Sequence, residues 1–229
     1  HLGGAAFLWA CAGLYAASYM RAAPGVKGFA IAWLLTLFGS LGTFLVADIA
    51  SFYLAFAFVS LPAYRLVTQE GSTRAARAGT VYMILAVAGE AFLLLAFVML
   101  ATIAQQGNPQ IADAVAEIAA SPWRDAIICL LILGFGLKMG LVPLHVWMPL
   151  AHPVAPMPAS AVLSGIVVKA GVIGLIRFLP FDAGLTAWGT ALTALGLVTA
   201  YYAVAVGVVQ KHPKTVLAYS TVSQMGFIA

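Results

Sequence analysis

Residues 126–158 read AIICLLILGFGLKMGLVPLHVWMPLAHPVAPMP, and this stretch decides the fold class. Its first part, 126–142, is long and apolar enough to cross a bilayer as a helix, which takes about 20 residues. Gly140 and Pro143 then interrupt the pattern, because proline removes a backbone donor and clashes with the preceding turn. Non-helical backbone at membrane depth is tolerated only where protein or water surrounds it. We therefore expect a broken transmembrane helix near residues 140–144.

Two lysines lie where a bilayer should disfavour them. Lys138 lies one turn before the expected break, and Lys169 lies within AVLSGIVVKAGVIGLIRFL (161–179). A lysine at the centre of a bilayer costs about 2.5–3.5 kcal/mol on insertion scales, and such residues usually mark ion pathways or proton relays. Burial favours the neutral form of a lysine, so the side chain can take and release a proton. The two lysines are the first candidates for a proton or cation pathway.

The composition indicates an integral membrane protein. Of the 229 residues, 63% are hydrophobic and 8% are charged, whereas a soluble domain carries about 25% charge. The formal net charge of +4 does not indicate nucleic-acid binding, because the basic residues lie in short loops between apolar runs. The chain starts at His1 rather than Met and ends at Ala229 inside an apolar run, so we expect a fragment (1–229) of one larger transmembrane domain.

Apolar segments of membrane-spanning length follow one another along the whole chain. Sustained period-two alternation is absent, and an open sheet cannot exist in lipid, so the expected fold is all-α: a polytopic helix bundle of about eight segments. Between two of them, Ile111, Val115 and Ile118 recur at helical spacing and predict a short surface helix. The expected spans are 2–20, 28–47, 49–67, 79–104, 125–142, 157–179 and 184–209, with an eighth that begins near Thr215.

The loop charges give an orientation, because basic residues in short loops stay on the cytoplasmic side. One set of alternate loops holds Arg21, Lys27, Arg65, Arg74, Arg77, Lys211 and Lys214 with one acid, Glu70, and we expect it inside. The opposite set holds Asp48, Asp113, Glu117, Asp125 and Asp182 with Arg124 and Arg177. Glu90, Lys138 and Lys169 belong to neither face.

Two further residues can take part in proton transfer. His145 follows the expected break, and histidine relays protons through its two ring nitrogens near neutral pH. Glu90 lies within YMILAVAGEAFLLLAFVML (82–100) and can switch the protonation of a lysine beside it. The alternatives are a static Glu90–lysine ion pair that locks helix packing, and a packing or interfacial role for His145. We expect His152 in a loop and Trp147 in the aromatic belt at the membrane interface.

The stretch GLKMGLVPLHVWMPLAHPVAPMPASAVLSGIVVKAGVIGLIRF (136–178) resembles the core signature of the proton-translocating antiporter-like family. That family includes large membrane subunits of respiratory complex I, of membrane-bound hydrogenases and formate hydrogenlyase, and of multisubunit cation/proton antiporters. The end, KHPKTVLAYSTVSQMGFIA (211–229), is similar to the segment that opens the second half of these subunits.

The resemblance implies about fourteen helices with two inverted repeats, each repeat with one broken helix. Residues 28–179 would be the first repeat unit, and 215–229 would start the second. Lys138 matches the lysine of the first broken helix, the central proton carrier of that half-channel. Lys169 and Ser164 match the region of the following helix that supplies the connecting residue.

One departure from the family pattern concerns the acidic partner of that lysine. The family usually carries a glutamate on the helix that here spans 49–67, but this chain reads AFAFVSLPAY (55–64), with Phe56 and Ala57 at that place. Either Glu90, one helix later, replaces the missing acid, or this half-channel is impaired. The sequence leaves both explanations open.

The expected function is that of a proton-translocating subunit in a respiratory NADH:quinone oxidoreductase-like or hydrogenase-like complex. A sodium/proton antiporter subunit and a non-conducting structural subunit are the alternatives. We expect no catalytic residues and neither a metal nor a cofactor, because no iron–sulfur, dinucleotide or haem motif is present, and electron transfer would occur in partner subunits. The expected partners are the lipid bilayer, other membrane subunits, and protons or Na⁺, in a bacterial-type inner membrane.

Overall fold

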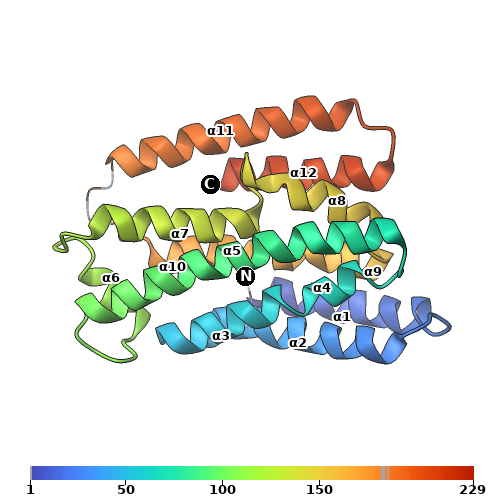
Figure 1. Ribbon diagram of the computed structural model, residues 1–229, viewed down its shortest axis with the longest axis horizontal. Coiled ribbons are helices and arrows are strands. Elements are labelled where there is room, and N and C mark those ends of the chain that lie inside the picture. Colours follow the sequence, from blue (N-terminus) through green and yellow to red (C-terminus); the bar gives the residue numbers. More distant parts are fainter. Residues whose placement is uncertain (1, 182–183, 185) are drawn as a thin grey trace.

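The computed structural model describes residues 2–181, 184 and 186–229, and over these residues the chain is a bundle of helices (Figure 1). No strand occurs among them, and the isolated bridge pairs Asp48 with Gln110. The expectation of an all-α fold is therefore confirmed. The elements are α1 (Leu2–Tyr19), α2 (Val26–Leu45), α3 (Ile49–Ser60), α4 (Ala63–Val67), α5 (Thr73–Ile103), α6 (Ile111–Ala116), α7 (Arg124–Met139), the 3₁₀ turn η1 (Leu144–Val146), α8 (Trp147–Val154), α9 (Met157–Val162), the π-helical turn η2 (Leu163–Val167), α10 (Lys169–Phe178), α11 (Thr186–Val208) and α12 (Pro213–Ile228).

Seven helical stretches within the described ranges are long and apolar enough to cross a membrane. They agree with the seven complete segments expected from hydropathy, and α12 begins next to Thr215, where the eighth was expected. The predicted surface helix is α6, in which Ile111 is buried. The spans are Leu2–Tyr19, Val26–Leu45, Ile49–Val67, Thr73–Ile103, Arg124–Val154, Met157–Phe178 and Thr186–Val208.

The fifth span is broken where glycine and proline interrupt the pattern. Helix α7 ends at Met139, and Gly140 follows with φ of 75°, a left-handed conformation that glycine adopts at little cost. The amide of Leu141 donates to the carbonyl of Gly136 at 3.0 Å, which closes the helix end. The chain passes Pro143, turns through η1 and resumes as α8. The expected break near 140–144 is confirmed.

The charged loops lie at the two ends of the bundle as the alternation predicts (Figure 1). The α1–α2, α4–α5 and α11–α12 loops share one end, called here the basic end because Arg21, Arg74 and Lys211 lie there. The α2–α3 and α5–α7 loops share the other, called the acidic end because Asp48 and Asp113 lie there. Asp182 lies outside the described residues. The assignment of the basic end to the cytoplasmic side stays a prediction.

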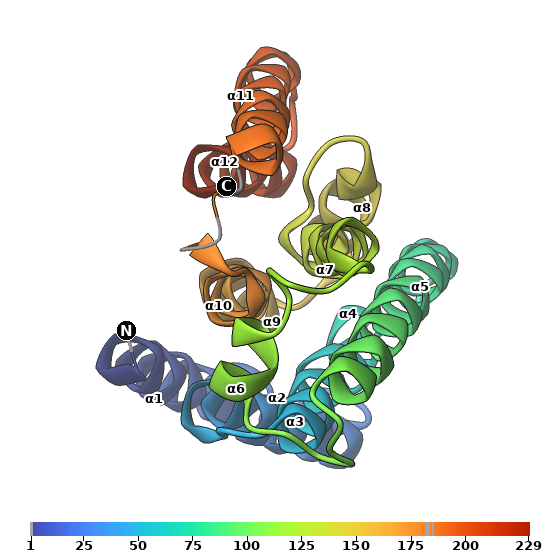
Figure 2. The same ribbon diagram turned by 90° about the vertical axis from the view of Figure 1, so that its left-hand side faces the viewer.

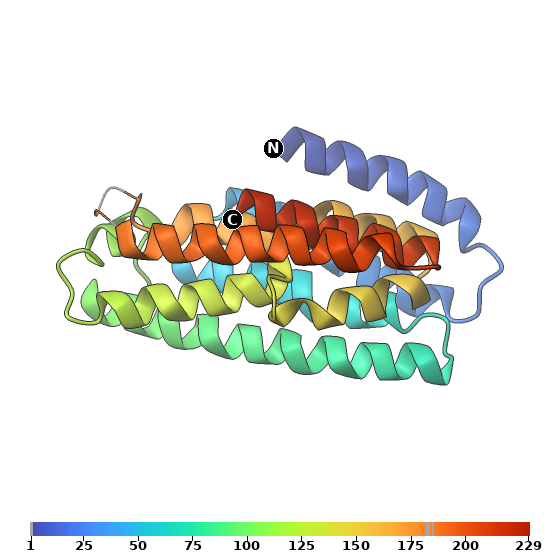
Figure 3. The same ribbon diagram turned by 90° about the horizontal axis from the view of Figure 1, so that it is seen from above.

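Helices α7 and α10 occupy the middle of the bundle (Figure 2). Helices α2 and α3 pack along one side, α5 flanks α7, and α1 packs against α9 at the edge. The α11–α12 hairpin lies on the opposite side and contacts α8 through α12 (Figure 3). It is also tied to the break, because the amide of Val142 donates to the hydroxyl of Thr199 on α11 at 3.0 Å.

A glycine sets how closely α2 and α3 approach. A Cβ atom added at Gly39 would lie 2.5 Å from the carbonyl oxygen of Ala55 and 2.6 Å from the amide of Val59, closer than side-chain atoms are found. Small residues at helix–helix contacts allow such backbone approach in membranes. This contact fixes α3 in the bundle and so places its last residue, Ser60.

Candidate functional site

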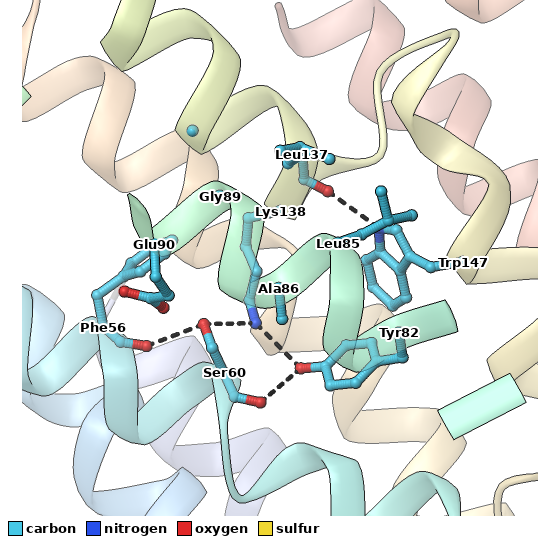
Figure 4. Close-up of a pocket in the computed structure, with 11 residues that line it drawn as sticks. Phe56, Ser60, Tyr82, Leu85, Ala86, Gly89, Glu90, Leu137, Lys138 and Trp147 are labelled. Atoms are coloured by element: carbon cyan, nitrogen blue, oxygen red, sulfur yellow. Dashed lines mark hydrogen bonds between the residues drawn. The ribbon is translucent and has the colours of Figure 1, made fainter. Parts of the chain in front are cut away.

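The broken helix places Lys138 in its last turn, in a pocket between α3, α5 and α7. The Lys138 side chain is buried. Its Nζ donates one hydrogen bond to Ser60 Oγ at 3.0 Å and one to the hydroxyl of Tyr82 at 3.3 Å (Figure 4). Both acceptors are uncharged hydroxyl groups, so these bonds position the ammonium without a directly bonded counter-charge.

The two hydroxyl groups are held by backbone carbonyls. Tyr82 donates to the carbonyl oxygen of Ser60 at 2.7 Å, and Ser60 Oγ donates to the carbonyl oxygen of Phe56 at 3.1 Å. Both hydroxyl protons are therefore used, and each oxygen keeps a lone pair for Lys138. This arrangement allows Lys138 to donate while it is protonated.

Aromatic rings form the walls around the ammonium. Lys138 Nζ lies 5.8 Å from the centroid of the Phe56 ring and 5.6 Å from that of Tyr82, within the range of cation–π attraction. The Trp147 ring packs edge-on against Tyr82 with 5.2 Å between centroids. The Trp147 Nε1 donates to the carbonyl oxygen of Leu137 at 2.9 Å, which satisfies an acceptor left open at the end of α7.

Glu90 lines the same pocket from α5. Its side chain is buried, and neither carboxylate oxygen has a hydrogen-bond partner among the described residues. Figure 4 shows the carboxylate beside Phe56 and Ser60, with the Lys138 ammonium across the Ser60 hydroxyl. A cavity of ≈ 10 Å³ remains in the pocket, which is about the space that one water molecule needs. The pocket thus holds a buried acid and a buried base.

The resemblance implies an acid near Phe56 and Ala57, and one of these two residues borders this pocket. Phe56 is one of its walls, whereas Ala57 does not line it. The structure therefore brings together Lys138, Glu90 and an apolar ring at the place where the sequence departs from the pattern.

The other three predicted residues lie apart from this pocket. Lys169 Nζ donates to the carbonyl oxygen of Ser164 at 2.6 Å and borders a second, mainly apolar cavity of ≈ 500 Å³. Ser164 Oγ shares a hydrogen bond of 2.7 Å with Thr221 Oγ1 on α12. His145 is buried, and its ring lies 5.1 Å from the Tyr202 ring on α11. Ser164 and His145 thus contact the α11–α12 hairpin, whereas the cavity beside Lys169 is lined mostly by residues of α1, η2 and α10.

Ser60, Tyr82 and Trp147 are pocket residues that the sequence reasoning missed. Tyr82, Ala86 and Glu90 are spaced i, i+4, i+8 on α5, so one face of that helix carries them all. That spacing could have identified Tyr82. No comparable local signal exists for Ser60, which reaches Lys138 across 78 positions of sequence.

Two minor predictions were wrong. Trp147 was expected in the interfacial aromatic belt, but it is buried inside the fifth span, because that span continues through the break to Val154. His152 was expected in a loop, but it lies buried in α8, where its Nδ1 shares a hydrogen bond of 3.0 Å with Ser160 Oγ. Proline-rich sequence suggested a loop at a place where the chain forms helix.

The described residues contain no group of three or more histidine, cysteine, aspartate or glutamate side chains that could hold a metal ion.

Known proteins share the sequence of this chain over most of its length. Residues 46–229 match the family described as NADH:quinone oxidoreductase/Mrp antiporter, transmembrane. The chain is 33% identical over 222 residues to hydrogenase-4 component B of Escherichia coli (strain K12), covering 94% of this chain and 33% of that protein. It is 29% identical over 201 residues to an NAD(P)H-quinone oxidoreductase chain 4 of Synechococcus sp. (strain JA-2-3B'a(2-13)), covering 85% of this chain and 38% of that one. The chain thus spans about a third of the length of these curated relatives.

Solved structures show the same fold. A chain of the membrane-bound sulfane sulfur reductase, an archaeal respiratory membrane complex, superposes with a TM-score of 0.86 at 26% identity, over 98% of this chain and 46% of that one. A chain of the Mrp complex from Dietzia sp. DQ12-45-1b gives a TM-score of 0.80 at 27% identity, over 87% of this chain and 22% of that one. These relatives and the seven apolar spans identify a multi-pass integral membrane protein, and a bacterial-type membrane is consistent with them.

Proposed function

Since this chain belongs to the NADH:quinone oxidoreductase/Mrp antiporter family of antiporter-like membrane subunits, we propose that it carries protons through the Lys138–Glu90 pocket. The observation that supports this most directly is the pairing of a buried lysine with a buried, hydrogen-bond-free carboxylate at the break of a transmembrane helix. Intramembrane ionisable residues in such surroundings mark proton relays and ion pathways.

The pocket favours a proton that moves rather than a locked ion pair. Both hydrogen bonds of Lys138 go to hydroxyl groups, and a buried carboxylate without partners keeps the desolvation penalty of an unsatisfied group, about 1–3 kcal/mol or more. A static ion pair would relieve that penalty by direct contact. A negative Glu90 stabilises the protonated form of Lys138, and protonation of Glu90 removes that stabilisation. Each group can therefore set the charge of the other.

Glu90 replaces, in this proposal, the acid that the family carries near position 57. It lies one helix later in the chain yet borders the same pocket as Phe56. Lys169, Ser164 and His145 form the proposed continuation toward α12, since Ser164 is hydrogen-bonded to Thr221 there. The proposed assembly includes other membrane subunits of a respiratory or hydrogenase-like complex. Residues 28–179 are proposed as one inverted-repeat unit, with 215–229 opening the next.

The test compares Lys138→Ala and Lys138→Arg in the intact membrane complex, reconstituted into vesicles. We expect proton flux per assembled complex to fall by about 100-fold in the alanine variant, as expected when a group needed for proton transfer is lost. Arginine should also fail, because it stays protonated in proteins. Lys211→Ala at the basic end is the control and should keep wild-type flux.

Three other outcomes separate the alternatives. Wild-type flux per complex in Lys138→Ala would end the proton-carrier proposal. Loss of assembly in Lys138→Ala with full function in Lys138→Arg would indicate a structural ion pair and a non-conducting subunit. If proton flux appears only after Na⁺ is added to a sodium-free buffer, the activity is sodium/proton exchange in place of proton pumping.

A further inference from the structure

Five phenylalanine rings pack into one layer that crosses the bundle. They come from four helices, α3, α5, α7 and α10, and none is more than 3% exposed. Phe97 and Phe178 lie closest, with 4.7 Å between ring centroids, and the Phe97–Phe135 contact is the widest at 6.4 Å. We call this set the phenylalanine layer; its members are Phe52, Phe56, Phe97, Phe135 and Phe178.

The layer extends from the wall of the Lys138–Glu90 pocket, where Phe56 lies, toward the acidic end. On α5, Phe97 follows Glu90 toward the acidic end by seven residues, or about 10 Å at 1.5 Å per residue. On α7, which runs away from the acidic end, Phe135 comes one turn before Lys138. The helix directions therefore put Phe97 on the acidic-end side of Glu90 and Phe135 on the acidic-end side of Lys138.

The Phe135 ring packs directly on the backbone of α10. A Cβ atom added at Gly174 of α10 would lie 2.1 Å from a carbon of that ring, so the ring fills the position where a side chain would be. Water that enters such a layer would find no hydrogen-bond partners on the rings, and apolar constrictions of this kind stop ions by excluding water.

A fixed cation lies on the far side of the layer. The guanidinium of Arg177 is 5.6 Å from the Phe52 ring centroid. It donates to the carbonyl oxygens of Thr43 at 2.9 Å and Val46 at 2.5 Å, at the C-terminal end of α2. These carbonyls carry the negative end of the helix dipole and hold the guanidinium in place. An arginine in a pore also repels approaching protons and cations.

We infer that the phenylalanine layer and Arg177 together form a barrier that closes the Lys138–Glu90 pocket to cations from the acidic end. This inference rests on the proposed function, in which the pocket carries protons. It adds that the pocket is closed on the side of the acidic end. Protons must then reach Lys138 from the basic end or from within the plane of the membrane. The barrier explains why five large rings from four helices meet beside a buried lysine.

The test measures passive proton conductance with the complex reconstituted in vesicles and turnover stopped. Phe97→Gln places an amide in the layer that can hydrogen-bond water, and we expect conductance to rise by about tenfold because the dry layer becomes wettable. Phe97→Leu keeps the site apolar, and apolar cavities stay dry, so its conductance should match the wild type. Phe38→Gln is the control for an added amide, since Phe38 is 64% exposed on the outer face of α2.

A second variant keeps the test decisive if Phe97→Gln does not assemble. Phe178→Gln alters the same layer from α10 and should raise conductance likewise. If the assembled glutamine variants conduct no more than Phe97→Leu, the barrier is wrong. If they leak while Lys138→Ala retains normal turnover flux, the barrier stands and the proposed proton carrier fails, so the two ideas are judged separately.

Discussion

Lys138 and Lys169 lie on successive spans, and the sequence presents them as equivalents, yet their surroundings differ. Lys138 donates to two hydroxyl groups in a small pocket that also holds Glu90. Lys169 donates to the carbonyl oxygen of Ser164, at the π-helical turn η2, and borders a much larger apolar cavity. A π-helical turn disturbs the regular hydrogen-bond ladder, and Lys169 supplies a donor there. In the proposed function the first lysine exchanges a proton with an acid, whereas the second also supports its helix.

Glu90→Gln should have the largest effect, because it removes the only acid that lines the pocket among the described residues. We expect proton flux per complex to fall by roughly 10- to 100-fold, the range for losing a positioned acid–base group. Glu117→Gln, at the acidic end, is the control. Full flux in Glu90→Gln would exclude Glu90 from the relay.

Lys169→Ala should have an intermediate effect on two measurements. Loss of the hydrogen bond to the Ser164 carbonyl should lower the free energy of unfolding by about 1 kcal/mol, the typical contribution of one such bond. Proton flux per complex should fall by less than in Lys138→Ala. Lys169→Arg keeps the donor and the charge, so it should restore stability without restoring flux. If Lys169→Arg restores both stability and proton flux, Lys169 only supports the helix. The two lysines would then differ fully in role.

Trp147→Phe should have a smaller effect, limited to the break. The substitution keeps an aromatic ring against Tyr82 and removes the hydrogen bond to the Leu137 carbonyl. An acceptor left unsatisfied costs about 1–3 kcal/mol when buried, so hydrogen exchange in residues 137–147 should accelerate. Trp123→Phe is the matched control because Trp123 is 60% exposed. Unchanged exchange in the Trp147 variant would show that other contacts close the end of α7.

Asp48→Ala should have the smallest effect, far from both lysines. Asp48 accepts hydrogen bonds from the Ser51 amide at 2.9 Å and from Asn108 Nδ2 at 2.8 Å, and these donors hold the pKa of the carboxyl below its usual value. Their stabilising contribution is present at neutral pH and is lost as the pH falls through that lowered pKa. Removing the cap should cost at most about 1 kcal/mol at this exposed site, whereas Asp48→Asn keeps an equally good cap. Equal melting temperatures for both variants would contradict this role.

The sequence contains enough to predict the spans, the break, and the position of both lysines within spans. Hydropathy fixes segment length, and Gly140 and Pro143 act locally on the backbone, so both signals are readable without a fold. The partners of Lys138 are different in kind. Ser60 and Tyr82 reach it from 78 and 56 positions away, through helix packing that depends on close contacts such as Gly39 against α3. Trp147 was misplaced because a span that breaks and resumes looks, in hydropathy, like a span that has ended.

The hydrogen bond between the Val142 amide and the Thr199 hydroxyl couples α11 to the break in the fifth span. Helix α11 packs mainly against α12. Its outer face is exposed, with Tyr201 70% exposed. This bond joins α11 to Val142, four residues from Lys138, and the contact of Tyr202 with His145 joins it to the same turn. A hydrogen bond of this kind contributes about 1 kcal/mol. Two contacts thus couple the position of α11 to the segment that ends α7.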